Sequence, residues 1–359
     1  MAGKADAAML DLLRTTLKNL PKDTWEEMWD YQQYPAFNAL QDKNISIEGG
    51  TSITRNVAWG DSGNFKFVRP YEVDTTVITD RQQEINVPFC HFQTSYAWNK
   101  IELAANRGKE QYISYVKSRV VDERKGLVNG LEEAFWNGRV SASDDRNPIG
   151  ITEILPMADA GSTTSGFVGK TIRYSGGTTG TIFEGLDANT YDKWRSYVQV
   201  YSALDNAFLE QFTKACLETT FFIPNFVPQP GDNKIGPSRA VYTSGEIVAK
   251  LFSLMGSKDD NYVGSDLLKR QTFVNANGVV SINSMPIMFA PAMTSTYGQL
   301  YAVDWSFMTP VVRAGNWLVE TDPIQKPDDH KTYVAYLDGS FNMLCKNRRR
   351  AGFLMHTPA

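Results

Sequence analysis

The clearest pattern of apolar and polar positions predicts a long helix within residues 97–137. Apolar side chains recur every four residues over this stretch, and the charged residues lie mostly off that line. The apolar positions are Tyr112, Val116, Val120, Leu127, Leu131 and Phe135. At 1.5 Å per residue such a helix would span roughly 50–60 Å, which suits a strut better than a compact enzyme. Asn137-Gly138 is a stop signal, and Gly126 and Gly130 are places for a break or bend.

Three other segments have a helical apolar pattern. Residues 5–20 form a short amphipathic helix ended by Pro21, and residues 187–222 carry a long apolar stripe. A third helix is predicted over 244–255, with Ser244 as its N-cap. Between the first two helices, aromatic residues crowd a segment broken by Pro35, which we interpret as an arm lying on another subunit. They are Trp25, Trp29, Tyr31, Tyr34 and Phe37.

Residues 48–96 have the alternation and glycine punctuation of a two-stranded excursion. Phe65–Arg69 and Glu84–Val87 alternate as strands do. A lone hairpin is marginal in water, so this one is expected to rest against a neighbouring chain. Residues 160–185 are rich in Gly, Thr and Ser and predict a loop or thin strand insertion.

Further strands are predicted in the second half of the chain. They cover Arg239–Thr243, Val311–Glu320, Tyr333–Asp338 and Phe341–Lys346. Asp338-Gly339 is a hairpin signal between the last two. Helices and strands are thus mixed, and the fold class is α+β.

Composition narrows the function classes. Across 359 residues, 42% are hydrophobic and 21% charged, which is ordinary for a folded protein. A net charge of −4 argues against general electrostatic binding of nucleic acid. Three cysteines cannot form a disulfide framework, so a reducing compartment fits, and no signal peptide or membrane span is expected. The chain is therefore expected in the cytoplasm.

No set of residues converges on catalysis, and we predict no catalytic, cofactor-binding or metal-binding residue. Gly60–Gly63 resembles the nucleophile loop of serine proteases, but the only nearby histidine, His91, has the wrong spacing and chain order. Gly169-Lys170-Thr171 lacks the first glycine of a phosphate loop. Cys90-His91 lacks a second ligand pair at a metal-site spacing.

A short basic run, Lys346–Arg350, lies near the C-terminus. A phosphate contact is one interpretation. A solvated strand end or salt bridges between subunits is the other, and the slightly acidic chain favours it.

From the N-terminus, the predicted elements are an arm, a two-stranded excursion, a strut-like helix and two mixed segments. Together they expose surfaces that one chain cannot bury by itself. This order resembles the HK97-fold major capsid proteins of tailed bacteriophages. Asn147–Ile151 after Trp136–Gly138 resembles that family's Gly-Ile turn after its spine helix. The resemblance implies an N-terminal arm at 1–48, an E-loop at 49–96 and a P domain with spine helix and Gly/Thr-rich insertion at 97–186. It further implies a mainly A-domain segment at 187–325 and a return to the P domain at 326–359.

The resemblance implies self-assembly into hexamers and pentamers of an icosahedral phage head that encloses double-stranded DNA without sequence specificity. The implied partners are a separate scaffolding protein, a portal and a possible decoration protein, with assembly in the host bacterial cytoplasm. It also implies that no N-terminal segment is removed, and we predict no cross-link through Lys66. The candidate contacts between subunits are Trp25, Trp29, Tyr31, Tyr34, Trp59, Phe65, Phe67, Arg69 and Tyr71.

Three alternatives stay open. An encapsulin-like nanocompartment shell shares the fold, and the helix at 5–20 would then bind cargo. Another virion structural protein, such as a tail-tube protein, would form rings or tubes. A hydrolase would use Ser62 and His91.

Overall fold

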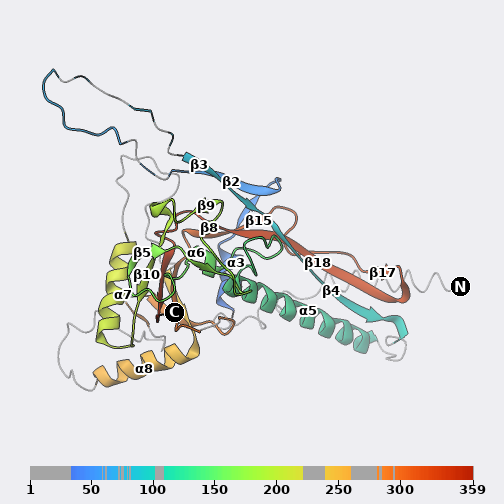
Figure 1. Ribbon diagram of the computed structural model, residues 1–359. Coiled ribbons are helices and arrows are strands. Elements are labelled where there is room, and N and C mark those ends of the chain that lie inside the picture. The colour runs from blue at the N-terminus through green and yellow to red at the C-terminus, as the bar shows by residue number, and fades with distance from the viewer. Residues whose placement is uncertain are drawn as a thin grey trace.

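A six-stranded sheet, a seven-stranded sheet, a long helix and a projecting two-stranded hairpin are the main parts of the computed structural model (Figure 1). The structure describes residues 34–58, 60, 63–71, 73, 77–78, 80, 82–101, 109–220, 239–259, 281–282, 285–293 and 296–358. The helix predicted over 5–20 lies outside these residues. None of the described helices is long and apolar enough to cross a membrane.

The predicted strut is helix α5, Lys109–Asn137. The start of the predicted stretch is wrong, because residues 97–99 belong to a strand, β4 (Cys90–Asn99). Its 29 residues correspond to about 44 Å. The apolar positions from Val116 to Phe135 are buried, which confirms the four-residue pattern. Gly126 and Gly130 lie exposed within one continuous helix, so no break occurs there.

Two glycines shape the turn that follows α5. Gly138 ends the helix with φ +65°, and its amide donates to the carbonyl of Ala134 at 2.9 Å. A Cβ on Gly150 would lie only 2.3 Å from the Gly138 Cα. The two backbones therefore touch, which only glycines permit, and the short helix α6 (Ile151–Ile154) begins directly afterwards.

The longest strand, β18, is the centre of a six-stranded sheet that lies along α5 (Figure 1). It pairs antiparallel with β4 over ten residues, from Thr332↔Asn99 to Phe341↔Cys90. The strands of this sheet are β1 (Ile45–Ile47), β4 (Cys90–Asn99), β15 (Met308–Arg313), β16 (Val319–Glu320), β17 (Ile324–Lys326) and β18 (Asp329–Cys345).

The hairpin predicted at Asp338-Gly339 is wrong, because β18 continues straight through both residues. They pair with Gln93 and Phe92 of β4. A Cβ on Gly339 would lie 2.2 Å from the Phe92 ring. The glycine therefore makes room for a cross-strand aromatic ring and does not form a turn.

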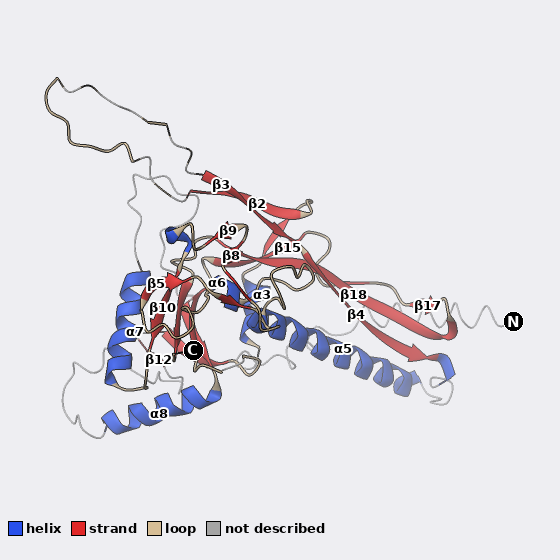
Figure 2. Cartoon of the chain, in the orientation of Figure 1, coloured by secondary structure: helices blue, strands red, loops and turns tan. Residues whose placement is uncertain are grey.

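A seven-stranded sheet forms the other part of the molecule, in the order β12-β13-β11-β14-β19-β10-β5. Successive residues of a strand point to opposite faces of the sheet, so this sheet contributes side chains to two hydrophobic cores. Tyr242 and Tyr301 lie in the core on one face, and Val241 and Phe353 lie in the core on the other. The second face is covered by helices α7 (Asn206–Thr219) and α8 (Gly245–Asp259) (Figure 2). The strands are β5 (Gly166–Gly169), β10 (Ser196–Val200), β11 (Arg239–Thr243), β12 (Ser281–Ile282), β13 (Met285–Phe289), β14 (Leu300–Asp304) and β19 (Gly352–His356).

The helix predicted over 187–222 is correct only in its second half. Residues 196–200 form β10, all five buried between β19 and β5. A short run that is apolar on both sides fits a buried strand as well as a helix, so its periodicity misled the prediction. Ser244 does precede α8, but its hydroxyl has no hydrogen-bond partner among the described residues. The predicted N-cap bond is therefore absent there.

The Gly/Thr-rich insertion consists of short strands, as predicted. β6 (Ile172–Arg173) pairs with β7 (Thr179–Gly180), and β8 (Ile182–Phe183) pairs with β9 (Leu186–Asp187). The 3-10 helix η1 (Asp192–Trp194) then leads into β10.

The basic run near the C-terminus is not a solvated strand end. Arg348 is 1% exposed and donates to the carbonyls of Ile154, Trp194 and Glu153 at 2.9, 3.0 and 2.7 Å. Its guanidinium also lies over the ring of Phe183. Neither interpretation of this run from the sequence was correct for Arg348, because the charge holds separate segments of one chain together.

Candidate assembly interface

A hairpin of β2 (Ser52–Ala58) and β3 (Gln82–Pro88) leaves the body of the molecule beside the six-stranded sheet (Figure 1). The strands pair antiparallel from Ser52↔Pro88 to Ala58↔Gln82, which confirms the predicted two-stranded excursion. Ile53, Ile85 and Val87 on its inner side are at most 6% exposed. The base of the hairpin is therefore packed into the core.

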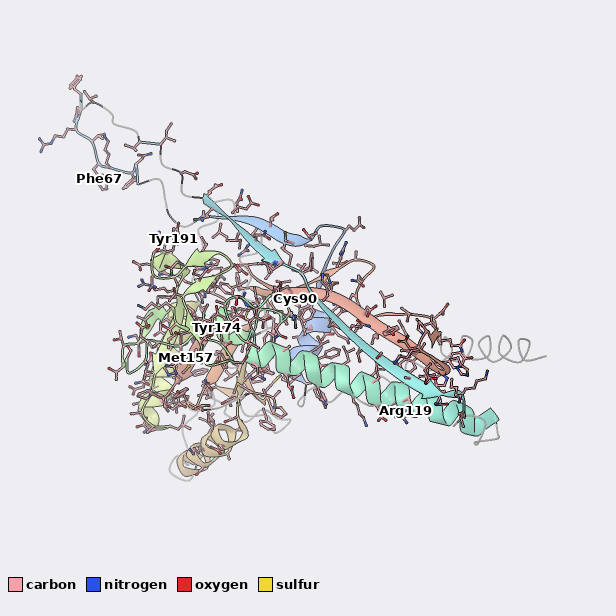
Figure 3. All side chains as sticks on the ribbon, turned by 45° about the vertical axis from the view of Figure 1, so that its right-hand side comes forward. Phe67, Cys90, Arg119, Met157, Tyr174 and Tyr191 are labelled. Carbon is pink, nitrogen blue, oxygen red and sulfur yellow. The ribbon has the colours of Figure 1, made fainter. Side chains whose placement is uncertain are left out.

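Polar side chains also fix this base. The Arg55 guanidinium donates to the carbonyls of Cys345 and Lys346, the second at 3.2 Å. The Tyr191 hydroxyl donates to Gln83 Oε1 at 2.8 Å. Figure 3 shows Tyr191 below the hairpin, on the side of the body. The hairpin thus leaves the body in a defined direction.

Beyond the paired strands, the described residues of the tip form no strand (Figure 2). The strand predicted over 65–69 is therefore wrong. Asn64 bridges the two limbs with its side chain: Nδ2 donates to the Val77 carbonyl at 2.9 Å, and Oδ1 accepts from the Val77 amide at 3.2 Å. This side-chain bridge stands where the prediction expected backbone pairing.

Large apolar side chains gather on this tip and face solvent. Phe65 is 84% exposed, Phe67 93% and Ile78 98%, and Tyr71 and Val73 are similarly open. The rings of Phe65 and Phe67 meet edge to face with centroids 5.3 Å apart. Exposed apolar clusters mark surfaces that another molecule covers. The tip is therefore the strongest contact candidate on the described chain.

The predicted contact residues fall into three groups. Phe65, Phe67, Arg69 and Tyr71 lie together on the tip, exposed. Tyr34 is half-buried and packs against the chain's own core. Outside the described residues lie Trp25, Trp29, Tyr31 and Trp59. Val73, Val77 and Ile78 on the returning limb are also exposed and were not predicted, although their apolar character within a polar stretch was a usable signal.

The part of the arm nearest the body is a helix, α3 (Pro35–Asp42), packed on α5. Pro35 starts this helix, where its missing N–H costs nothing. Glu132 of α5 accepts from the amides of Ala36 and Phe37 at 3.3 and 2.8 Å, and from Trp136 Nε1 at 2.6 Å. Burial raises the pKa of Glu132, and these three donors oppose the rise. The sequence gives no local sign of this long-range cap.

A cavity of about 260 Å³ lies under the hairpin base. Its wall includes β3, the turn after α5 and the segment between β8 and β9. Cys90 and Tyr174, labelled in Figure 3, line it. Burial raises the pKa of the Cys90 thiol to about 11, so this cysteine is neutral and unreactive near neutral pH.

The described residues that were considered for catalysis take part in contacts within the chain. His91 Nδ1 lies 2.6 Å from the Ser340 hydroxyl, but Ser340 is fully buried. Ser62 lies outside the described residues. The side chain of Lys170 forms an ion pair with Asp159 at 3.0 Å, next to β5. In a phosphate-binding loop this lysine would instead be directed at a phosphate held by backbone amides. Across the described ranges, no three His, Cys, Asp or Glu side chains lie close enough together to hold a metal ion.

Comparison with solved structures identifies the architecture. The cyanophage A-1(L) capsid asymmetric unit matches with a TM-score of 0.58 at 14% identity, over 91% of this chain and 93% of that one. The chain has the HK97-like capsid fold. The sequence matches no protein-family model and no curated protein.

Two more solved structures match over similar lengths. A chain of Mycobacterium phage Bobi matches with a TM-score of 0.50 at 9% identity, over 89% of this chain and 90% of that one. A virus-like particle from Pyrococcus furiosus matches with a TM-score of 0.45 at 12% identity, over 96% and 98%. The TM-score of 0.45 is too low to support the nanocompartment alternative. At such identities the shared feature is the fold.

Proposed function

We propose that this chain is the major capsid protein of a tailed bacteriophage and that it self-assembles into hexamers and pentamers of an icosahedral head. The observation that carries the proposal is the exposed apolar tip on a hairpin whose base is buried. A monomer gains nothing from such a tip, whereas a shell in which each tip lies on a neighbour buries it. The HK97-like fold supports the same role.

The tip supplies the contact chemistry that a shell requires. Phe65, Phe67 and Tyr71 are large side chains that lose little conformational entropy when they are covered. The described tip joins the paired strands without regular structure, so it can adapt to several neighbouring environments. We expect tip contacts to supply most of the affinity, and charged pairs to set the register.

The proposed partners follow from the same role. Double-stranded DNA would be enclosed without sequence readout, in keeping with the net charge of −4. A separate scaffolding protein, a portal and a possible decoration protein would complete the particle, assembled in the host bacterial cytoplasm. The role is structural and needs no catalysis. The nanocompartment alternative depended on the helix at 5–20, which the structure does not describe.

Electron microscopy of the full chain, expressed alone and with its neighbouring genes, tests this role. Closed polyhedral shells of uniform size are the expected result. Rings or tubes would favour another virion protein, and protein density inside closed shells would favour a nanocompartment. A monodisperse monomer in both preparations would overturn the proposal.

A further inference from the structure

Strand β4 lies at an edge of the six-stranded sheet, because among the described strands it pairs with β18 alone. It runs for ten residues, from Cys90 to Asn99, without a shift of register. The other edge strands of the two large sheets are β1, β5, β12, β16 and β17, and each has only two to four residues. Within the described chain, β4 is therefore the one long edge of these two sheets.

The backbone of Ser95, in the middle of β4, points toward the free edge. Its partner on β18 is Tyr336. The Tyr336 carbonyl accepts from the Thr321 amide at 2.8 Å, and the Tyr336 amide donates to Thr321 Oγ1 at 2.9 Å, so both groups point away from β4. In an antiparallel pair, two opposite residues either exchange backbone hydrogen bonds or both turn away. The N–H and C=O of Ser95 therefore point away from β18.

The same direction holds for every second residue of β4, because the backbone alternates with a period of two. These residues are His91, Gln93, Ser95 and Ala97, and all four are exposed. Within the described part of the chain, no backbone hydrogen bond satisfies their N–H and C=O groups on this side. A row of unpaired backbone groups is a template for pairing with another strand.

The edge of β4 lacks the features with which proteins guard such a strand. Lys, Asp, Glu, Arg and Pro are all absent from Cys90–Asn99. The regular register contains no bulge that would twist the edge away from a partner. An unguarded edge of this length is expected to be covered in the working assembly.

Helix α5 restricts what can pair with this edge. It packs against β4, and the side chain of Thr94 is hydrogen-bonded to Glu123 of α5. A second β4 paired antiparallel with the first would bring its own α5 to about one strand spacing, ~4.8 Å, whereas packed helices need about 8–10 Å. The edge therefore accepts a single extended segment better than a second copy of the same sheet.

The outgoing limb of the hairpin tip is such a segment. Residues 64–69 belong to no strand, and the contact between the rings of Phe65 and Phe67, two positions apart, fits an extended backbone. Six extended residues cover about 20 Å, which matches the free part of β4. The two rings are exposed, and Ser95 and Ala97 offer small side chains on the open face of β4, where large rings have room to lie.

We propose that residues 64–69 from the hairpin tip of a second copy of this chain add to the free edge of β4 as a further strand. The proposal rests on the assembly role above and names the surface that accepts the tip. A second copy is required because each tip points away from its own body (Figure 1). Main-chain hydrogen bonds supply the affinity of such an added strand, and the rings over the small side chains set its register.

A proline on the edge tests the added strand. Ser95→Pro removes an N–H that is unpaired in the single chain and places a ring where the new strand would approach. It is expected to raise the protein concentration needed for shell formation at least about tenfold, whereas the matched Ser95→Ala keeps the N–H and should change it less than about twofold. Sedimentation follows assembly, and circular dichroism checks the fold. Folded Ser95→Pro protein that assembles like wild type would overturn the proposal.

Hydrogen exchange of the wild-type chain gives a second readout that needs no variant. In unassembled protein the amides of Ser95 and Ala97 are expected to exchange rapidly and those of Thr94 and Tyr96 slowly, because only the second pair bonds to β18. In shells the amides of Ser95 and Ala97 should exchange at least about tenfold more slowly. Alternate amides of residues 64–69 should slow with them.

The outcomes separate the two proposals. Wild-type shells in which Ser95 and Ala97 still exchange rapidly would overturn the added strand alone. Slow exchange at these two amides without any change at residues 64–69 would remove the tip as the occupant of the edge. Wild-type protein that forms no shell under any condition would contradict the assembly role and the added strand together.

Discussion

An aromatic ring on the neighbouring strand leaves room only for glycine at position 339. The Phe92 ring lies where a Cβ at 339 would be, and it also meets Trp317 and Phe341 edge to face. Gly130 has the opposite setting, because nothing lies within 4 Å of the corresponding Cβ position on the exposed side of α5. The same residue type is therefore required at one position and merely tolerated at the other.

Alanine substitutions should separate these two glycines. Gly339→Ala is expected to lower the free energy of unfolding by about 1–3 kcal/mol, because the added carbon overpacks the ring cluster. Gly130→Ala is expected to raise it by about 1 kcal/mol through helix propensity. Urea unfolding of both variants checks the pair, and equal effects would contradict this account.

His356 is a buried histidine held in its neutral form. Its Nδ1 lies 2.6 Å from the Thr357 carbonyl, so Nδ1 donates, and Nε2 accepts from the Ala158 amide at 3.3 Å. A proton on Nε2 would face another N–H. Burial lowers the pKa of His356, and the charge of Arg173 lowers it further.

This shift makes stability depend on pH. Since the folded-state pKa of His356 lies below its ordinary value of 6.5, the unfolded chain binds more protons in that interval. The free energy of unfolding is therefore expected to fall as pH drops below about 6.5. Glu184 contributes with the opposite sign, because its raised pKa favours the folded state at low pH and that contribution is lost as pH rises through about 7.

The His356 contribution can be isolated in a Glu184→Gln background. Unfolding free energies are measured from pH 8 to 5, and His356→Asn should flatten the loss on the acidic side. An unchanged slope would contradict the role assigned to His356.

At the scale of elements, the hairpin divides into a buried base and an open tip. The base buries Ile53, Ile85 and Val87, whereas Phe67 on the tip touches little of its own chain. Phe37 on α3 is the contrasting phenylalanine, because it is fully buried against α5. Folding stability and the proposed assembly contact thus involve different phenylalanines.

Two matched truncations test that division. Phe67→Ala is expected to leave the free energy of unfolding unchanged and to raise the concentration needed for assembly about tenfold or more, since hot-spot aromatics dominate contacts. Phe37→Ala is expected to cost about 3–5 kcal/mol of folding stability through loss of buried surface and a cavity. A Phe67→Ala variant that assembles like wild type would remove the tip from the contact.

At the scale of the whole molecule, Arg348 joins three segments that are distant in sequence. Its guanidinium donates to carbonyls at the C-terminal ends of α6 and η1, while its backbone lies between β18 and β19. Burial lowers the pKa of Arg348 to about 10, so it stays charged at neutral pH. Because the donors form a rigid fork, lysine cannot replace all three bonds.

Arg348→Lys is therefore expected to cost about 2–4 kcal/mol of folding stability, as buried carbonyls lose their donors. Arg349→Lys is the control, because Arg349 is only half-buried and donates at 3.2 Å to one carbonyl, that of Asp192. Thermal and urea unfolding compare the two. Equal losses would show that position 348 has no special linking role.

The sequence by itself determined the elements whose local pattern matches their surroundings. The period of α5, its end at Gly138, the two-stranded base of the hairpin and the apolar residues of its tip were all predicted, because one-sided burial leaves a period in the sequence. The order of these elements was enough to suggest the fold.

Only the tertiary structure decided features that depend on residues far apart in the chain. β10 is a strand because both of its faces are buried, Gly339 extends a strand because Phe92 lies across it, and Arg348 is buried because three distant carbonyls surround it. The cavity under the hairpin base likewise needs residues from separate segments. Such contacts leave no local period, since the partners are brought together only when the chain has folded.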